Sequence, residues 1–166
     1  MIAERAKMNE ALIFRHFPNK RSLYAAIIER KISADPLLAG LDQDAETPDL
    51  DALLRSLAKR ALQSIGDDPQ FFRLLYFSGL ENHSLSKMFF DSYSQCVSSF
   101  LAGRIEAGMK EGKFRTLDPF LCARTFIGMV VHHALSAEIF KKDPGRWKEE
   151  ELIETFVTLF LSGLRK

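Results

Sequence analysis

The sequence predicts an all-α fold, and three observations support that class. Apolar residues recur at intervals of three and four along most of the 166 residues, which is the spacing of one helix face. Aspartate–proline pairs stand at Asp68-Pro69 and Asp118-Pro119, where an aspartate caps a helix and proline occupies its first turn. No segment shows the sustained alternation of a strand. The chain is 46% hydrophobic and 27% charged, as expected of a globular protein with a sizeable core.

The first thirty residues predict three short helical segments in close succession. Residues 2–6 end one helix, residues 7–9 form a tight turn, and residues 10–17 form a two-turn helix. Pro18 ends that helix, because the residue before a proline is pushed out of α geometry. Asn19 then caps a helix that starts at Lys20.

A two-turn helix after a three-residue turn has the shape of a helix-turn-helix that enters a DNA major groove. An ordinary helical hairpin of a bundle remains the alternative. The charge distribution favours the DNA-binding interpretation. Residues 1–31 hold seven basic and three acidic side chains, whereas the remainder holds 16 basic and 19 acidic ones. Positive charge at one end of a near-neutral chain indicates a polyanionic partner for that end.

The string AERAKMNEALIFRHFPNKRSLYAAIIER resembles the DNA-binding signature of the TetR/AcrR family of bacterial transcriptional regulators. The pairs His16-Phe17, Asn19-Lys20 and Leu23-Tyr24 fall in register with that signature. Three positions depart from it, since Lys7 replaces the usual glycine, Leu12 the usual threonine and Phe14 the usual tyrosine.

Family members carry a complete helix, and the start of the next, before the point that matches Ile2. The resemblance therefore implies a domain that is N-terminally truncated within its helix-turn-helix. Two expectations follow. Either residues upstream of Met1 complete the domain, or the chain binds DNA poorly.

The resemblance also implies roles for individual residues of this segment. Glu10, Ala11 and Arg15 would read base edges: arginine pairs with guanine, glutamate accepts from cytosine, and alanine packs on the thymine methyl. Asn9 would cap the recognition helix and touch a phosphate, and His16 and Lys20 would bind phosphates. For His16, a half-buried position beside Phe17 is the alternative.

Beyond residue 32 the sequence predicts an acidic connector and then five helices. The connector spans residues 33–48, is interrupted by Pro36, Gly40 and Pro48, and has room for one short turn of helix. The helices are expected at about residues 50–65, 69–80, 84–112, 119–140 and 149–164. The chain thus divides into a partial DNA-binding domain with its linking helix, residues 1–32, and a larger helical domain, residues 33–166.

The two final helices, residues 119–140 and 149–164, are apolar in a way that predicts a partner. The first is apolar on nearly every face, so both of its sides must be covered. The resemblance implies a homodimer in which these two helices of each copy form a four-helix bundle, and a two-fold dimer suits two DNA half-sites. A central core helix in a monomer is the alternative.

The resemblance further implies a cavity for a small effector among the middle helices, where many of the fourteen phenylalanines lie. Polar side chains are scarce there, which favours a largely apolar or aromatic ligand held by one or two hydrogen bonds. Arg104 and Arg124 are candidates for an acidic ligand instead, or for ordinary surface arginines. The candidate ligand-binding residues are Phe72, Phe77, Tyr93, Cys96, Phe100, Phe126, Met129 and His133.

Catalysis and metal binding find no support in the motifs. No Gly-rich phosphate loop, nucleophile elbow or His-Glu-x-x-His pattern occurs, and His132 and His133 diverge by about 100° on a helix. Cys96 and Cys122 fit no metal or redox spacing. We therefore expect no catalytic residue, metal or cofactor, no membrane association, and a cytoplasmic location.

Taken together, these patterns predict a ligand-responsive transcriptional repressor that binds double-stranded operator DNA as a homodimer. A small, largely apolar effector would release it. The alternative is a helical ligand-binding or dimerisation module that no longer binds DNA.

Overall fold

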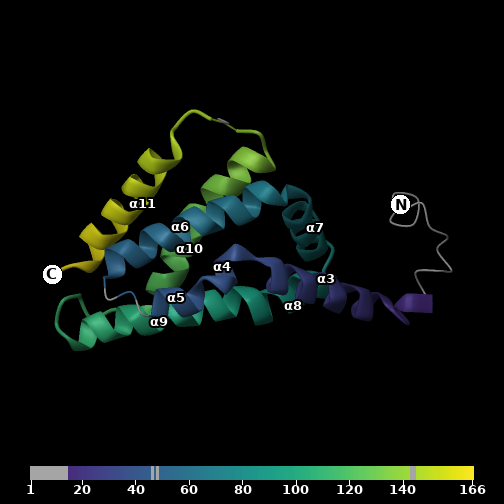
Figure 1. The fold of residues 1–166 in the computed structure, drawn as a ribbon, viewed down its shortest axis with the longest axis horizontal. Helices are drawn as coiled ribbons and strands as arrows, with labels where there is room; N and C mark the ends of the chain where they lie inside the picture. The colour runs from purple at the N-terminus through teal and green to yellow at the C-terminus, as the bar shows by residue number, and fades with distance from the viewer. Residues whose placement is uncertain (1–14, 46, 48, 143–144) are drawn as a thin grey trace.

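The computed structural model describes residues 15–45, 47, 49–142 and 145–166. These residues are helical throughout except for connecting turns, as the sequence predicted, and the one extended pairing among them is an isolated bridge between Phe114 and Arg165. Helix α3 extends outward from one end of the bundle, and the C-terminus lies at the opposite end (Figure 1). Asn9, Glu10 and Ala11, together with the departures at Lys7, Leu12 and Phe14, lie outside the described residues.

Helix α3, Lys20–Ala34, begins as the sequence predicted. Asn19 caps it: the Ser22 amide donates to Asn19 Oδ1 at 2.9 Å, and the Asn19 amide donates to Ser22 Oγ at 3.3 Å. Tyr24 and Ile28 are the buried side chains of α3 and join the main hydrophobic core. The helix that follows the predicted DNA-reading segment thus packs against α4 and α8.

The connector predicted at residues 33–48 is mostly helical, which corrects the sequence-based expectation. It contains the end of α3, then α4, Pro36–Ala39, and α5, Leu41–Ala45. Asp35 caps α4 by accepting from the Leu37 amide at 2.9 Å. Leu37 and Leu41 are both buried, so this short segment is held by the core that it covers.

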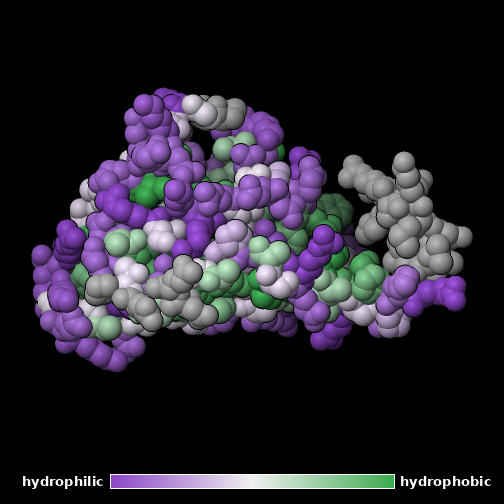
Figure 2. Space-filling view, in the orientation of Figure 1, coloured by the Kyte–Doolittle hydropathy of each residue, from purple (hydrophilic) through white to green (hydrophobic). Residues whose placement is uncertain are grey.

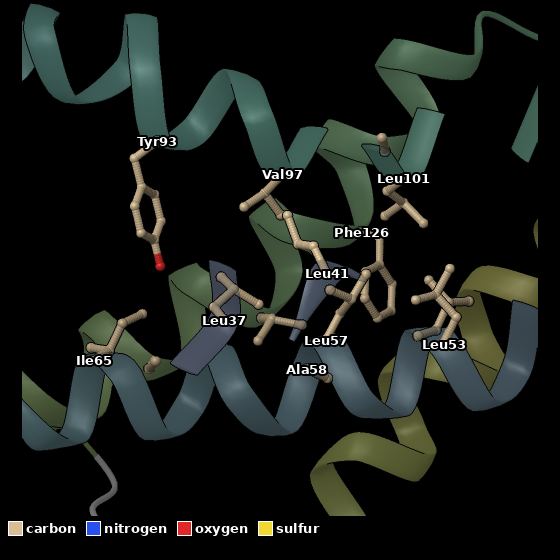
Figure 3. Packing of buried hydrophobic residues seen from close by; sticks show 14 of the residues in the cluster. Leu37, Leu41, Leu53, Leu57, Ala58, Ile65, Tyr93, Val97, Leu101 and Phe126 are labelled. Carbon is tan, nitrogen blue, oxygen red and sulfur yellow. The ribbon is translucent and has the colours of Figure 1, made fainter. Parts of the chain in front are cut away.

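Helices α6, Leu50–Asp67, and α7, Pro69–Leu80, have nearly the predicted bounds. Asp68 caps α7 by accepting from the Phe71 amide at 3.1 Å, with Pro69 in the first turn. Helix α6 buries a stripe at helical spacing that faces α4 and α10. Figure 3 shows part of this stripe, Leu53, Leu57 and Ile65, opposite Val97 and Leu101.

The long helix predicted at residues 84–112 is interrupted once. It consists of α8, Ser84–Phe89, a π-helical turn η1, Phe90–Ser94, and α9, Gln95–Lys110. A π turn inserts extra residues into the helical repeat and shifts the register of the faces on either side. The buried residue of this turn is Tyr93.

Helix α10, Pro119–Glu138, contacts α6, α7, α9 and α11 and is capped by Asp118, which accepts from the Leu121 amide at 2.7 Å. By length and composition alone α10 is long and apolar enough to cross a membrane, and 28% of its most apolar 18 residues are buried. Its contacts with those four helices make it part of the helical bundle. Helix α11, Glu149–Leu164, carries the predicted acidic first turn.

One face of the bundle is mostly polar (Figure 2). Figure 2 shows a mostly hydrophilic face over α6, with hydrophobic side chains gathered toward the end where α3 and α8 lie. That end carries α7 and the π turn, and the cavity lies next to them.

Candidate ligand-binding site

A cavity of about 210 Å³ lies inside the helical domain. Its walls come from α4, α6, α7, the α8–η1–α9 unit and α10, elements that are far apart in the sequence. Most of the lining is apolar. The polar side chains of the lining are Ser64, Tyr76, Tyr93, Ser94, Ser98 and Arg124.

Three of the eight ligand-binding residues predicted from the sequence line this cavity. Phe72 reaches it from α7, Tyr93 from the π turn and Phe126 from α10, and all three are buried. The structure therefore brings together the aromatic residues of three separate helices. Their role in binding a ligand stays a prediction.

The other five do not line the cavity in the part of the chain that the structure describes. Phe77 is 57% exposed on the outer face of α7, because five residues along a helix turn it away from Phe72. His133 instead contacts the rings of Trp147 and Phe156, and burial lowers the pKa of its imidazole. Cys96 is exposed, and Phe100 and Met129 are half-buried.

Aromatic rings form one end of the cavity wall. Phe89 and Tyr93 stack with ring centroids 4.7 Å apart, and Phe72 meets Phe89 edge-on at 6.4 Å. Phe71 meets Phe72 edge-on at 5.4 Å behind that wall. Such stacked and edge-to-face contacts are the preferred packing of aromatic pairs.

A buried carboxylate organises the polar end. Asp35, 1% exposed, accepts from Tyr93 Oη at 2.8 Å and from Ser64 Oγ at 2.5 Å. Lys31 Nζ lies 3.0 Å from the Asp35 carboxylate. Burial, together with the charge of Asp35, raises the pKa of the Tyr93 phenol well above its usual range. Tyr93 therefore stays protonated and donates to Asp35.

Lys31 fixes the end of α3 to this wall. Its ammonium lies 5.5 Å from the Phe71 ring centroid and 5.3 Å from that of Phe72, and it donates to the Ser64 carbonyl at 3.4 Å. The set Lys31, Asp35, Ser64 and Tyr93, which we call the Asp35 cluster, joins α3, α6 and the π turn. Two of its members, Ser64 and Tyr93, also line the cavity.

The two arginines proposed for an acidic ligand differ in position. Arg124 lines the cavity and is exposed at its rim. Arg104 instead donates to the Ala45 carbonyl at 2.8 Å and to the Thr47 carbonyl. Arg104 thus holds the chain between α5 and α6.

Sequence reasoning missed Lys31, Asp35 and Ser64. One signal was available for Asp35, since Asp35-Pro36 repeats the aspartate–proline pattern that predicted the caps of α7 and α10. That pattern would have found the cap of α4. Nothing in it indicates that the carboxylate is buried beside a cavity.

At the N-terminal end the structure describes Arg15, His16 and Lys20, and all three are exposed. His16 is therefore not the half-buried histidine of the alternative interpretation, whereas Phe17 beside it is half-buried. Lys20 Nζ lies 5.4 Å from the Tyr24 ring centroid at the start of α3. These side chains are accessible to a polyanion, and their contact with DNA stays a prediction.

Two family profiles match the chain. The profile described as bacterial regulatory proteins of the tetR family matches residues 1–27. The profile described as the C-terminal domain of the AefR-like transcriptional repressor matches residues 52–163, more than half of the chain. The chain belongs to the TetR family. The family named from the N-terminal signature is thereby confirmed.

Several solved structures share the fold. A protein from Mesorhizobium loti MAFF303099 assigned to this family aligns with a TM-score of 0.73 at 20% identity, over 99% of this chain and 85% of its own. AibR in complex with isovaleryl coenzyme A and operator DNA aligns with a TM-score of 0.68 at 22% identity, over 95% of this chain and 83% of its own. A transcriptional regulator from Cytophaga hutchinsonii ATCC 33406 aligns with a TM-score of 0.59 at 20% identity, over 99% of this chain and 86% of its own. A comparison with curated protein sequences gives no match.

Proposed function

We propose that this TetR-family protein is a cytoplasmic transcriptional repressor whose DNA binding is released by a small, largely apolar effector in the cavity. The observation that carries the proposal is the Asp35 cluster. It connects two residues of the cavity wall, Ser64 and Tyr93, to Lys31 in the last turn of α3. Helix α3 begins at Lys20, four residues after His16.

The coupling follows from what the cluster holds in place. A ligand that moves Tyr93 or Ser64 changes the hydrogen bonds of Asp35, and a buried carboxylate tolerates a lost partner poorly. Lys31 follows the carboxylate, and α3 moves with Lys31. The ligand shifts the protein toward the arrangement that it binds better, so release of DNA requires that the cavity be better formed in the non-binding arrangement.

The DNA-binding end is proposed from the signature and from exposure. Arg15, with Glu10 and Ala11, would read bases, and His16, Lys20 and Asn9 would contact phosphates. AibR, a protein of the same fold, was solved with both operator DNA and isovaleryl coenzyme A. That precedent supports a DNA site and an effector site on one chain.

A homodimer through α10 and α11 completes the proposal. Leu121 on α10 is 64% exposed and Leu159 on α11 is 63% exposed, although both helices belong to the core of the domain. Two exposed leucines on these helices are what a partner copy would cover. A two-fold dimer would present two recognition helices to two half-sites.

A module that no longer binds DNA is the second candidate, and the substitutions at Lys7, Leu12 and Phe14 favour it. Leu12 and Phe14 lack hydroxyls that in the family bond phosphates. Lys7 replaces a glycine at the turn. The experiment below separates this candidate from the repressor.

The test is DNA binding by the protein expressed from its complete gene. We expect selective binding to a duplex from upstream of that gene over unrelated DNA, weakening steeply with salt. Ala61→Phe fills the cavity from α6 and should change the operator affinity, whereas Ala52→Phe, on the exposed face of α6, should not. Equal weak binding to both duplexes, or none at low salt, would favour the second candidate.

A further inference from the structure

We propose that the cavity selects effectors that carry a hydrogen-bond donor, such as an alcohol or phenol, over effectors that carry only acceptors. The hydroxyl groups of Tyr93 and Ser64 give the cavity this preference because both donate to Asp35. The inference rests on the proposed function and names the chemical class of its effector.

The preference follows from counting protons. A hydroxyl group has one proton to donate and two lone pairs to accept with. Tyr93 Oη uses its proton on Asp35 Oδ1 at 2.8 Å, and Ser64 Oγ uses its proton on Asp35 Oδ2 at 2.5 Å. Both residues line the cavity. What remains for a ligand is oxygen lone pairs, which accept from a ligand hydroxyl or N–H and repel a ligand carbonyl or carboxylate.

The two protons are not free to turn toward a ligand. Asp35 is buried, so a lost donor would leave part of the carboxylate without a hydrogen bond and away from water. Figure 3 shows the Tyr93 hydroxyl directed from the π turn into the space next to α6, where Ile65 lies. Burial and the charge of Asp35 also raise the pKa of that phenol, so the proton stays on Tyr93.

Among the other polar groups of the lining, Arg124 can only donate and therefore favours acceptors, but it is exposed. The hydroxyls of Ser94 and Ser98 make no side-chain hydrogen bond among the described residues, so they can turn to donate or to accept. Tyr76 is 46% exposed at the rim, and Arg124 is exposed there. The Asp35 cluster is therefore the buried part of the wall that discriminates between donors and acceptors.

The cavity volume sets the size of a suitable probe. An engineered apolar cavity of about 150 Å³ in another protein binds benzene. The cavity here, about 210 Å³, therefore has room for one ring with a short polar substituent. Four probes share a ring and differ in that substituent: toluene with none, benzyl alcohol with a donor, benzaldehyde with an acceptor only, and benzoate with a charged acceptor.

The experiment measures dissociation constants of the four probes by ligand-observed NMR with the complete protein. One additional hydrogen bond corresponds to about fivefold in affinity. We expect benzyl alcohol to bind about fivefold more tightly than benzaldehyde, and more tightly than benzoate.

Two variants assign the preference to the cluster. Tyr93→Phe and Ser64→Ala each remove one acceptor, and each should bring the ratio of the benzaldehyde to the benzyl alcohol dissociation constant toward one. Ser99→Ala removes a hydroxyl from the exposed face of α9, outside the lining of the cavity, and should leave the ratio unchanged. Two independent variants keep the test open if one of them fails to fold.

The outcomes separate this inference from the proposed function. Binding of the ring compounds with benzaldehyde or benzoate tighter than benzyl alcohol would overturn the inference alone. A ratio that neither Tyr93→Phe nor Ser64→Ala changes would also overturn it. Failure of all four probes to bind, toluene included, would overturn the cavity as an effector site, and the inference with it.

Discussion

Two buried carboxylates anchor the same short segment to the same helix, yet they do so in different ways. Asp35 is 1% exposed and Asp44 is 5% exposed, and they stand at the two ends of the α4–α5 segment. Asp35 reaches Ser64 near the end of α6, and Asp44 pairs with Arg60 one turn earlier on α6. Both fix the connector that the sequence had predicted to be irregular.

The partners differ in number and place. Asp44 depends on the single cation of Arg60, which also donates to Ser56 at 2.7 Å and covers Gly40. None of these groups belongs to the described lining of the cavity. Asp35 instead accepts from groups on α4, α6 and the π turn and pairs with α3, and two of those partners line the cavity. The comparison teaches that burial of a carboxylate does not define its role, whereas the location of its partners does.

The largest effect on stability is expected at the pair that serves structure only. Asp44→Ala leaves the Arg60 guanidinium partly buried without its carboxylate, and its Nε already has no hydrogen-bond partner in the described structure. We expect a loss of about 3–5 kcal/mol in the free energy of unfolding. Urea denaturation measures it. The probe preference of the cavity should not change in the folded variant, and a change there would break the comparison.

A smaller loss of stability with a larger effect on the cavity is expected at the other carboxylate. Asp35→Asn keeps the shape but replaces one acceptor by an NH₂ donor, at a cost of about 2–3 kcal/mol. One of the Tyr93 and Ser64 protons is then free to face the cavity. In the NMR titration, the ratio of the benzaldehyde to the benzyl alcohol dissociation constant should therefore fall. An unchanged preference with reduced stability would make Asp35 a purely structural residue like Asp44.

A pH effect follows from the phenol that donates to Asp35. The raised pKa of Tyr93 means that the native state keeps a proton that the unfolded chain loses near pH 10. Stability should therefore fall as the pH rises above about 10, by up to about 1.4 kcal/mol per pH unit. Tyr93→Phe should flatten that slope in urea denaturation across pH 9–11. Equal slopes in the two proteins would contradict a tightly held phenol.

The smallest effect is expected at an exposed carboxylate. Arg55 donates to Glu154 at 2.6 Å, and this hydrogen bond lowers the pKa of Glu154, so its contribution is present at neutral pH and is lost on acidification. Solvent and salt screen such a pair. Glu154→Gln should shift the thermal midpoint very little at neutral pH. A loss comparable with that of Asp44→Ala would show that burial is not what separates these pairs.

Helix positions and helix starts were predictable because they depend on residues near in sequence. Asn19, Asp68 and Asp118 each accept from an amide three residues ahead, and each was predicted as a cap. The helices of the connector were missed, although Asp35-Pro36 marks the start of α4, because its prolines and glycine were interpreted as breaks in the helical pattern. The π turn was also missed, since no proline or glycine marks residues 90–94.

The candidate site was predictable only in part. Phe72, Tyr93 and Phe126 line the cavity. Phe77 lies on the outer face of α7, the helix that carries Phe72, and Cys96 is exposed three residues after Tyr93. Aromatic content indicates which helices are apolar but not which side of each faces the interior. The π turn adds to this uncertainty because it changes the helical register just before α9.

The sequence by itself determined the TetR family, the all-α class and the helix caps, because a motif and a cap are local patterns of residue types. Only the tertiary structure decided that Asp35 is buried beside a cavity. Ser64 and Tyr93 lie 29 and 58 positions away from it along the chain, on separate helices. Whether an aspartate is solvated or enclosed by donors depends on how those helices pack, and packing follows from many apolar contacts rather than from the residues beside it.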